Sequence, residues 1–293
     1  MSMKNKISLG TAQFGMNYGI TNTSGKVGLS EIRKILNFAK QNGIESIDTA
    51  SNYGDSEANL GLADTSSFKI TTKLPELDLA DKTKIRSNIN QFINKSLTNL
   101  KRESLDSLLF HKPSQLLHED GQIIWDFIEE QKDSGLIKKI GFSIYSPDEI
   151  DQLMVSFKPD IIQCPYNFFD RRMSEFGYFK KLNELEIDIQ VRSIFLQGLL
   201  LLNHDNLPEK FSKWKKLWID YDAWIKSKNL DKMELLLNFV LSDNRINDVV
   251  IGVANFEQAE EIILKSNNLF EIPKNKFSID DIDLINPSRW HKS

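Results

Sequence analysis

The feature that most constrains the fold is a regular alternation of short apolar runs with amphipathic stretches along the chain of 293 residues. The runs are too short for helices, and each is apolar without the polar–apolar alternation of a half-exposed strand. This is typical of parallel strands that are buried on both faces. The eight predicted strands are Ile7-Leu9, Ile44-Asp48, Phe68-Thr72, Ser107-His111, Ile140-Ser143, Asp160-Cys164, Asp188-Arg192 and Asp248-Ile251.

The segments between these runs have helical periodicity. Residues Ile32 to Ala39 place apolar side chains at i, i+3, i+4 and i+7 after Ser30, which we interpret as an N-cap. Ile85 to Leu100 continues one apolar face for about four turns. Ser146 to Glu149 has the pattern of a helix start, with proline at the first helical position and an acid that completes a capping box. Eight strand–helix units without a linker or repeat predict a closed (β/α)8 TIM barrel, as a single domain over residues 1–293.

Additional length follows the seventh predicted strand. The segment from Lys210 to Ser242 carries two helical patterns instead of one. Trp214, Trp218, Tyr221 and Ile225 share one helical face there, and we interpret this stripe as core packing. The alternative is that one of these aromatic residues lines the mouth of a substrate pocket.

Composition narrows the class of protein. The formal net charge of −4 gives no reason to expect a nucleic acid or an anionic membrane as a partner. The single cysteine, Cys164, excludes an internal disulfide and fits a reducing compartment. The longest apolar run, Ile194 to Leu202, is far too short to span a membrane, and residues 1–6 contain no apolar signal core. We therefore expect a soluble cytoplasmic protein with a small-molecule partner; the oligomeric state is not predicted.

Four polar residues lie at or just after the ends of predicted strands. Asp48 and Tyr53 belong to Asp48-Thr-Ala-Ser-Asn-Tyr-Gly54, Lys73 follows the third strand, and His111 ends the fourth. Because chemistry in such barrels takes place at the C-terminal ends of the strands, these side chains are expected to converge on one pocket. A carboxylate, a phenol, an ammonium and an imidazole together suggest a proton-donating site.

Such a set suits the reduction of a carbonyl group. Hydride addition creates an alkoxide that needs a proton as it forms, and Tyr53 is the candidate acid. A nearby Lys73 ammonium is expected to lower the pKa of the phenol, with Asp48 holding the lysine in place. A neutral His111 can donate a hydrogen bond to the carbonyl oxygen.

Other interpretations remain open for single members of this set. Asp48 alone is a possible helix cap, and His111 alone is a possible structural hydrogen-bonding group. Lys73 is a possible Schiff-base nucleophile of a barrel lyase or isomerase.

With these four residues in order, the chain resembles the aldo-keto reductase family from Leu9–Gly15 to the region of Val250–Ala254. In that family the residues matching Asp48, Tyr53, Lys73 and His111 form the catalytic tetrad. The resemblance implies an NADP(H)-dependent reductase of an aldehyde or ketone, without a metal and with NAD(H) not excluded; a sugar or sugar-derived carbonyl is one conceivable substrate. A redox-sensing or regulatory module that binds NADP(H) with little turnover is the alternative.

The resemblance also implies where the cofactor lies. No Gly-x-Gly-x-x-Gly follows the first strand, so a Rossmann-type site is not suggested. Ser143 and Gln163 match positions that hold the nicotinamide carboxamide. The other positions matching the family's cofactor site are Thr11, Ala12, Asp48, Arg192, Ser193, Phe195, Gln197, Gly198, Gly252, Asn255, Gln258 and Glu261. For Asn255 and Gln258, a helix-capping pair is an equally good explanation.

Four positions depart from the family's cofactor pattern. Ile144 stands where an asparagine usually contacts the carboxamide, and Ile262 replaces an asparagine that contacts adenine. Gln258 stands where an arginine often binds the 2′-phosphate, which weakens a preference for NADPH over NADH without reversing it. Arg192 stands where an aromatic residue stacks on the nicotinamide, and it is expected either to add charge near the ring or to reach a phosphate.

The substrate pocket is less well defined by the sequence. Ala12 stands where many members have a tryptophan, which suggests a roomier or more polar pocket. Three residues of neighbouring loops are candidates to face it: Phe14, Tyr18 and His118.

Overall fold

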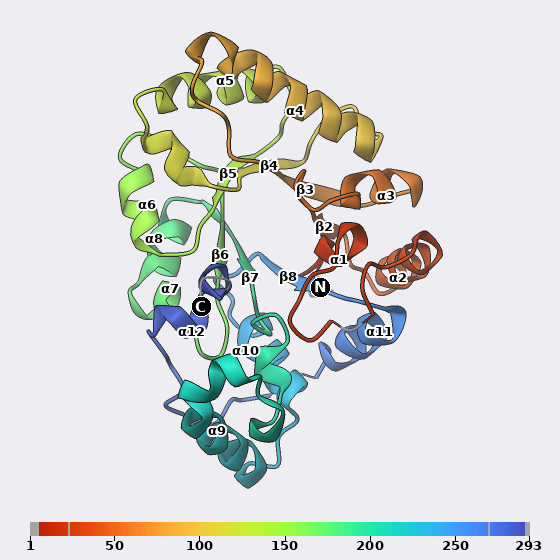
Figure 1. Cartoon of the computed structure of the whole chain (residues 1–293), viewed down its shortest axis with the longest axis vertical. Helices are drawn as coiled ribbons and strands as arrows, with labels where there is room; N and C mark the ends of the chain where they lie inside the picture. The colour runs from red at the N-terminus through yellow and green to blue at the C-terminus, as the bar shows by residue number, and fades with distance from the viewer. Residues whose placement is uncertain (1–5, 23, 269, 291–293) are drawn as a thin grey trace.

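A closed barrel of eight parallel strands forms the centre of the protein in the computed structural model, which describes residues 6–22, 24–268 and 270–290 (Figure 1). Each strand pairs with the next, and β8 pairs with β1, so the predicted (β/α)8 barrel is confirmed. Only the interpretation of residues 1–5 lies outside the described residues. The strands are β1 (Ile7–Gly10), β2 (Ser46–Asp48), β3 (Lys69–Leu74), β4 (Ser107–Phe110), β5 (Ile140–Ser143), β6 (Ile161–Pro165), β7 (Asp188–Arg192) and β8 (Asp248–Gly252).

Helices surround the barrel and cover its outer face (Figure 1). They are α1 (Ala12–Gly15), α2 (Leu29–Gln41), α3 (Ser56–Leu62), α4 (Ile85–Leu100), α5 (Gly121–Asp133), α6 (Asp148–Leu153), α7 (Arg172–Glu175), α8 (Tyr178–Glu184), α9 (Lys215–Ser227), α10 (Lys232–Leu241), α11 (Phe256–Lys265) and α12 (Ile282–Ile285). Short 3₁₀ segments span Lys82–Lys84, Pro113–Leu117, Leu199–Leu201, His204–Asn206, Glu209–Trp214 and Pro287–Arg289.

Helix starts follow local capping chemistry. Glu149 accepts hydrogen bonds from the backbone N–H groups of Tyr145 and Ser146 at 2.8 Å, which confirms the acid of the predicted capping box. The helix itself begins one residue later than predicted, at Asp148, with Pro147 as its cap in place of Ser146. The N-cap assigned to Ser30 is wrong, because α2 already begins at Leu29 and Gly28 is its cap. The N–H of Ile32 donates to the Gly28 carbonyl, so the first helical turn includes Ser30.

Most strand residues are buried, although in β8 the partly buried Val250 lies between the buried Val249 and Ile251. The side chains on the two faces of a strand can also differ in character. In β6, Ile162 and Cys164 belong to the apolar layer between strands and helices, whereas Gln163 lies between them in the sequence and points to the opposite side. Gln163 is also fully buried, and hydrogen bonds satisfy its side chain. The prediction of strands without alternation is therefore wrong for β6, because its interior position is polar rather than apolar.

A second apolar cluster lies beside the barrel, where α9 packs outside α10 (Figure 1). Trp218, Tyr221 and Ile225 of α9 are buried in it, and Trp214 is partly buried there. The rings of Trp218 and Tyr221 pack edge-on against Phe169. The prediction that this stripe is core packing is therefore confirmed.

Among the described residues, no helix is both long enough and apolar enough to cross a lipid bilayer.

A substitution at Gly141 tests how closely β5 and β6 pack against each other in the barrel. A Cβ atom at this position would lie 2.0 Å from the Ile161 carbonyl oxygen, so Gly141→Ala must push two paired strands apart. We expect the free energy of unfolding in urea to fall by about 2–3 kcal/mol. Gly28→Ser is the matched control, because nothing lies within 4 Å of its added Cβ; we expect a change below about 0.5 kcal/mol. Equal effects of the two variants would contradict this account of the packing.

Candidate active site

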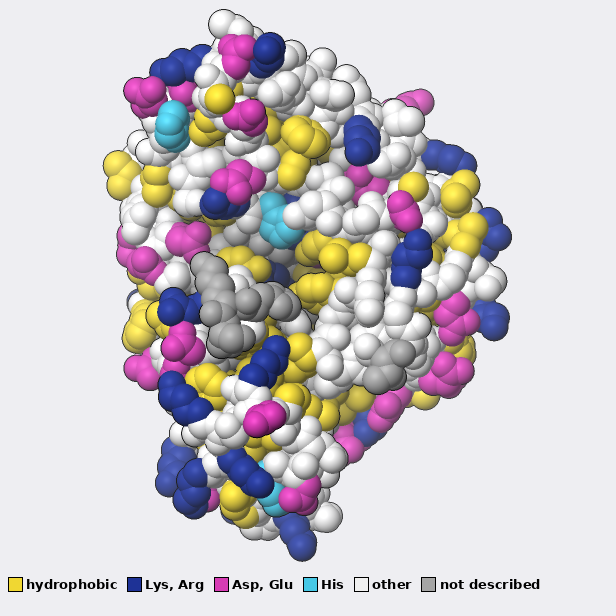
Figure 2. Space-filling model, in the orientation of Figure 1, with side chains coloured by type: hydrophobic (Ala, Val, Ile, Leu, Met, Phe, Trp, Pro, Cys, Tyr) yellow, Lys and Arg dark blue, Asp and Glu magenta, His cyan; other side chains and the backbone are white. Residues whose placement is uncertain are grey.

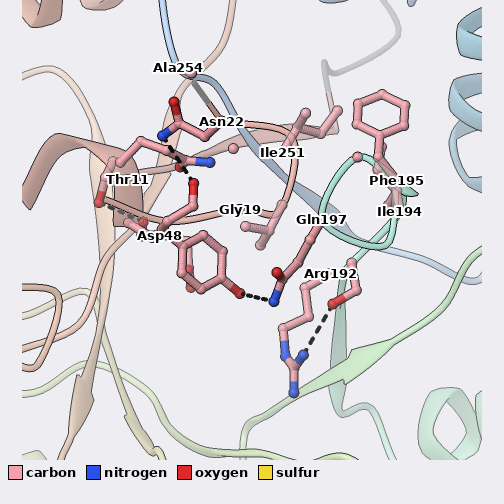
Figure 3. A pocket seen from close by; sticks show the side chains of 18 of the residues that line it. Thr11, Gly19, Asn22, Asp48, Arg192, Ile194, Phe195, Gln197, Ile251 and Ala254 are labelled. Carbon is pink, nitrogen blue, oxygen red and sulfur yellow. Dashed lines mark hydrogen bonds between the residues drawn. The ribbon is translucent and has the colours of Figure 1, made fainter. Parts of the chain in front are cut away.

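A pocket opens at the C-terminal ends of the strands, as expected for a barrel of this type. Its cavity volume is about 470 Å³, and Figure 2 shows the hollow near the middle of this face, with hydrophobic and histidine side chains at its edge. Asp48, Tyr53 and His111 line it together. The C-terminal ends of β1, β2, β7 and β8 and the segments that follow them supply most of the remaining wall (Figure 3).

Lys73 and Asp48 form a buried ion pair beneath this pocket. The Lys73 Nζ atom lies 2.7 Å from each Asp48 carboxylate oxygen and 3.0 Å from the Thr49 carbonyl oxygen. Only 1% of the Lys73 side chain and 4% of the Asp48 side chain are exposed. Burial lowers the pKa of Lys73, and Asp48 opposes this effect. The three N–H groups of the ammonium are therefore all satisfied inside the protein.

The loop after β2 places Tyr53 above this ion pair. Gly54 allows the turn, because its backbone has a φ of +56° and a side chain there would strike the Gly15 carbonyl oxygen. The Lys73 Nζ atom lies 5.2 Å from the centroid of the Tyr53 ring. The His111 ring meets the Tyr53 ring edge-on, at a centroid distance of 5.9 Å and an angle of 83°. The four residues predicted from the strand ends thus lie together.

The electrostatics of the tyrosine differ from the expectation. Burial and the Asp48 carboxylate raise the pKa of Tyr53 above its ordinary value, although Arg192 opposes the shift. The pKa of Tyr53 is therefore raised overall rather than lowered as predicted, because burial is the largest cause of the shift and the Asp48 carboxylate adds to it. Burial lowers the pKa of His111 to about 3, and the positive charges of Lys73 and Arg192 add to the shift. The site thus holds a protonated phenol and a neutral imidazole at neutral pH.

A glutamine pair continues the network into the barrel. Gln163 Nε2 donates to Asp48 Oδ1 and to Gln190 Oε1, both at 2.6 Å, and Ser143 Oγ donates to Gln163 Oε1 at 3.1 Å. Since the Asp48 carboxylate only accepts, the NH₂ group of Gln163 must face it and Gln163 Oε1 must face Ser143. Gln190 was not predicted as a site residue. The sequence did contain an indication of it, because Gln190 is a second polar residue inside an apolar strand, β7, and it pairs in register with Gln163 of β6.

Arg192 projects from the end of β7 into the same pocket. Its Nη2 atom donates to the Ile144 carbonyl oxygen at 2.9 Å. Its Nη1 atom donates to Ser193 Oγ at 3.2 Å (Figure 3). The guanidinium carbon lies 4.2 Å from the centroid of the Tyr145 ring. Tyr145, which also lines the pocket, was not predicted as a site residue.

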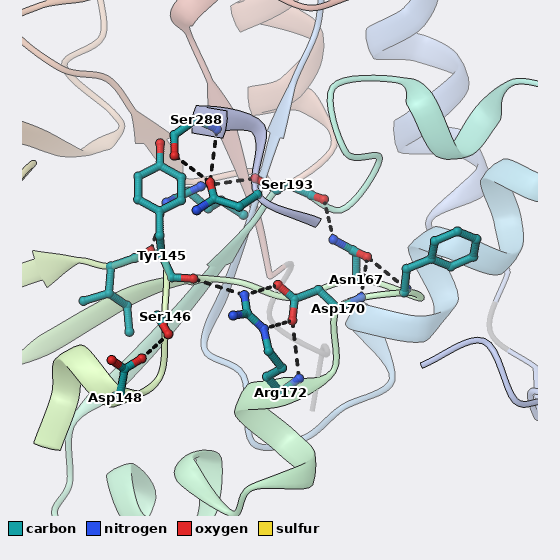
Figure 4. Close-up of polar contacts among 12 residues, drawn as sticks. Tyr145, Ser146, Asp148, Asn167, Asp170, Arg172, Ser193 and Ser288 are labelled. Atoms are coloured by element: carbon teal, nitrogen blue, oxygen red, sulfur yellow. Dashed lines mark hydrogen bonds and ion pairs between the residues drawn. The ribbon is translucent and has the colours of Figure 1, made fainter. Parts of the chain in front are cut away.

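A buried network behind the pocket fixes the backbone on both sides of this arginine. Arg172 pairs with Asp170 at 2.8 Å and donates to the Tyr145 carbonyl oxygen at 3.1 Å (Figure 4). Asn167 Nδ2 donates to the Ser193 carbonyl oxygen at 3.1 Å. The loop after β6 therefore links the loops that follow β5 and β7.

In the loop after β7, three residues other than glycine adopt a left-handed backbone conformation that raises the conformational free energy of the folded state. Ser193, Leu196 and Gln197 have positive φ angles of 63°, 49° and 55°. For residues other than glycine, such conformations cost on the order of 1–3 kcal/mol each and gather at functional sites. Gln197 also contacts the loop after α1, since its Nε2 atom donates to Tyr18 Oη at 3.3 Å and its carbonyl accepts from Thr21 Oγ1 at 3.5 Å (Figure 3).

Most residues assigned to the cofactor by resemblance line this pocket: Thr11, Ala12, Asp48, Ser143, Gln163, Arg192, Ser193, Phe195, Gln197, Gly198, Gly252, Gln258 and Glu261. Asn255 does not line it. Its Oδ1 atom instead accepts from the N–H of Gln258 at 2.8 Å and caps α11, so the capping explanation is confirmed. Gln258 Oε1 accepts from the Ala254 N–H at 3.0 Å, and Glu261 pairs with Lys265 at 3.2 Å.

The loop residues expected near the substrate are only partly placed there. Tyr18 lines the pocket. Phe14 does not, because it is fully buried in the main apolar core, and His118 lies at the surface beside Asp120. Further lining residues that the sequence did not single out for the pocket are Gln13, Met16, Gly19, Thr21, Asn22, Asn52, Ile194, Leu201, Met233, Val250 and Ile251.

Comparison with known proteins agrees with this architecture. A model of the aldo/keto reductase family matches residues 6–286. The aldo-keto reductase YhdN of Bacillus subtilis (strain 168) is 31% identical over 187 residues, which cover 58% of this chain and 52% of YhdN. The uncharacterized oxidoreductase YqkF of the same organism is 25% identical over 191 residues, covering 62% of this chain and 61% of YqkF. The alignments thus span less than two thirds of either relative.

Solved structures of similar fold are also aldo-keto reductases. The holo form of AKR11C1 from Bacillus halodurans has a TM-score of 0.70 and 18% sequence identity, and the match covers 94% of each chain. A putative aldo-keto reductase from Pseudomonas aeruginosa has a TM-score of 0.65 and 18% identity, with 89% of each chain covered. At this identity the similarity shows the fold alone. Because the family model spans nearly the whole sequence, the chain belongs to the aldo/keto reductase family.

Proposed function

We propose that this protein reduces an aldehyde or ketone to an alcohol by hydride transfer from NADPH, with NADH as a weaker alternative. Aldo-keto reductases are oxidoreductases that generally bind nicotinamide cofactors and act on small-molecule carbonyl compounds. The observation that carries the proposal is the buried Lys73–Asp48 pair directly beneath Tyr53 and His111 in one pocket. A phenol, an imidazole and a satisfied ammonium suit proton donation to a new alkoxide.

The residues divide this work between them. Tyr53 donates its proton to the oxygen of the substrate as negative charge develops there. His111 is neutral, so its N–H can orient the carbonyl oxygen without competing as an acid. Lys73 holds a positive charge under the Tyr53 ring, and Asp48 keeps that charge in place. None of these roles requires the buried Lys73–Asp48 pair to move.

The pocket also fits a nicotinamide cofactor, which would supply the hydride. The orientation of the Gln163 amide leaves Oε1 as an acceptor beside Ser143 Oγ, and this pair suits the NH₂ group of a carboxamide. Ile144 is fully buried and apolar, so its side chain supplies no donor for the carboxamide oxygen. The strained loop from Ser193 to Gly198 and the wall formed by Gly252 and Gln258 leave room for the rest of a dinucleotide.

A Schiff-base mechanism has less support. Lys73 does not line the pocket, and its three N–H groups already bind Asp48 and Thr49. An amine must lose a proton and reach the substrate before it can attack a carbonyl. Lys73 would have to break its ion pair to do either.

Tyr53→Phe tests the proposed acid. The change removes only the hydroxyl, so we expect kcat for a reduced aldehyde or ketone to fall by at least ~10², with the Kd for NADPH little changed. Tyr178→Phe is the matched control, because Tyr178 is a partly buried tyrosine on α8 that does not line the pocket. Full activity of Tyr53→Phe would rule out the assignment. Tight NADPH binding by the wild type without any turnover would instead favour a regulatory module.

The pH dependence of reduction follows from the shifted groups. The acid form of Tyr53 is present below its raised pKa and is lost only as the pH rises through that value. His111, with its pKa lowered to about 3, stays neutral at every higher pH used. We therefore expect kcat/KM for reduction to be nearly flat from about pH 5 to about pH 9. A drop within this range, while circular dichroism stays constant, would contradict the assigned protonation states.

Gln258 is expected to limit the preference for NADPH. Its side-chain oxygen is engaged with the Ala254 N–H, and an amide lacks the charge that favours a 2′-phosphate. Titration by tryptophan fluorescence quenching should give micromolar binding of NADPH and somewhat weaker binding of NADH. Gln258→Arg should raise the affinity ratio in favour of NADPH by about tenfold, whereas Gln258→Met should not raise it. Binding of neither cofactor would remove the reductase proposal.

A further inference from the structure

Arg192 carries the unbalanced charge of the pocket. Its five N–H groups make two hydrogen bonds to described residues, both to neutral oxygens, at Ile144 and Ser193. No carboxylate of the described residues forms an ion pair with it, and the Tyr145 ring lies against its guanidinium at 4.2 Å. Removing a guanidinium partly from water without a counter-ion destabilises the folded protein. A bound ligand that interacts with the charge would explain why it is kept here.

The other charges around the pocket are balanced. Lys73 is neutralised by Asp48 at 2.7 Å, and Glu261 pairs with Lys265 at the far wall. His111 is a neutral imidazole. Among the lining residues that the structure describes, the charge without a counter-ion is therefore that of Arg192.

This charge is fixed in position rather than free to swing away. Two hydrogen bonds hold one edge of the guanidinium, and the Tyr145 ring holds one of its faces at 4.2 Å. The ion pair of Arg172 with Asp170 in turn fixes the Tyr145 backbone. A ligand in the pocket therefore meets a preorganised cation.

A carboxamide held by Ser143 and Gln163 would bring the nicotinamide ring near this cation. Ser143, Gln163 and Arg192 lie on three consecutive strands, with Ser143 and Arg192 at the ends of β5 and β7 and Gln163 within β6. Arg192 binds the carbonyl of Ile144, the residue directly after Ser143. The carboxamide is bonded directly to the ring, so a cofactor held by Ser143 and Gln163 brings its ring to this part of the pocket. The ring carries a positive charge when oxidised and none when reduced.

We propose that Arg192 makes this pocket bind the reduced nicotinamide cofactor in preference to the oxidised form. The inference rests on the proposed function, because it assumes that the pocket holds this cofactor. The two forms share the same phosphates, riboses and adenine, so the contacts of those groups largely cancel in the ratio of the two dissociation constants. The repulsion between Arg192 and the oxidised ring does not cancel. During turnover, Arg192 thus promotes release of the oxidised cofactor after each reduction.

The test is the equilibrium binding of NADPH and of NADP⁺, measured separately by isothermal titration calorimetry without substrate. The wild type should bind NADPH on the order of tenfold tighter than NADP⁺. Arg192→Gln should lower this ratio by about tenfold, chiefly by tightening NADP⁺. Arg192→Lys keeps the charge and should keep the ratio within about twofold. Lys228→Gln removes an exposed positive charge next to α9 and should leave the ratio unchanged.

The outcomes separate this inference from the proposed function. If the wild type binds neither form, the proposed function fails before any variant is made. If the wild type binds both forms equally well, the function stands and the role of Arg192 is wrong, even if Arg192→Gln does not fold. A parallel loss of both affinities in a folded Arg192→Gln would overturn the inference in favour of a phosphate contact. Unchanged affinities would overturn it by showing that the charge does not reach the ring.

Discussion

The buried ion pair between Lys73 and Asp48 is the interaction on which the rest of the pocket depends. Removing two charges from water costs several kcal/mol per ion, and a well-packed apolar pair would often stabilise a fold as well. Here the cost is offset because every N–H of the ammonium is satisfied and Asp48 accepts a further hydrogen bond from Gln163. A pair of this kind fixes a charge directly below the Tyr53 ring, which an apolar pair would not do.

The closed barrel is what makes this arrangement possible. Parallel strands bring β2, β3, β6 and β7 to the same end, and their interior positions lie in register. Asp48, Lys73, Gln163 and Gln190 thus form one continuous buried network although they are far apart in the sequence. Because each amide and carboxylate in it constrains the next, the orientation of Gln163 follows from the ion pair.

Two departures from the family pattern turn out to be in contact with each other. Ile144 lacks the side-chain amide expected at its position, and its carbonyl oxygen accepts a hydrogen bond from Arg192, the second departure. Tyr145, which follows Ile144, stacks against the same guanidinium. The loss of a neutral donor and the gain of a cation therefore belong to one rearrangement of the cofactor side of the pocket, with Tyr53 and His111 on the other side unchanged in type.

The sequence by itself determined the barrel and the four residues at its strand ends. Strand–helix alternation is a local property, and a closed parallel barrel places its strand ends on one face, so Asp48, Tyr53, Lys73 and His111 were found without coordinates. Only the tertiary structure decided the charge state of Tyr53, the role of Gln190 and the partners of Arg192. Each depends on burial and on distances between different strands, and no local pattern in the chain records these.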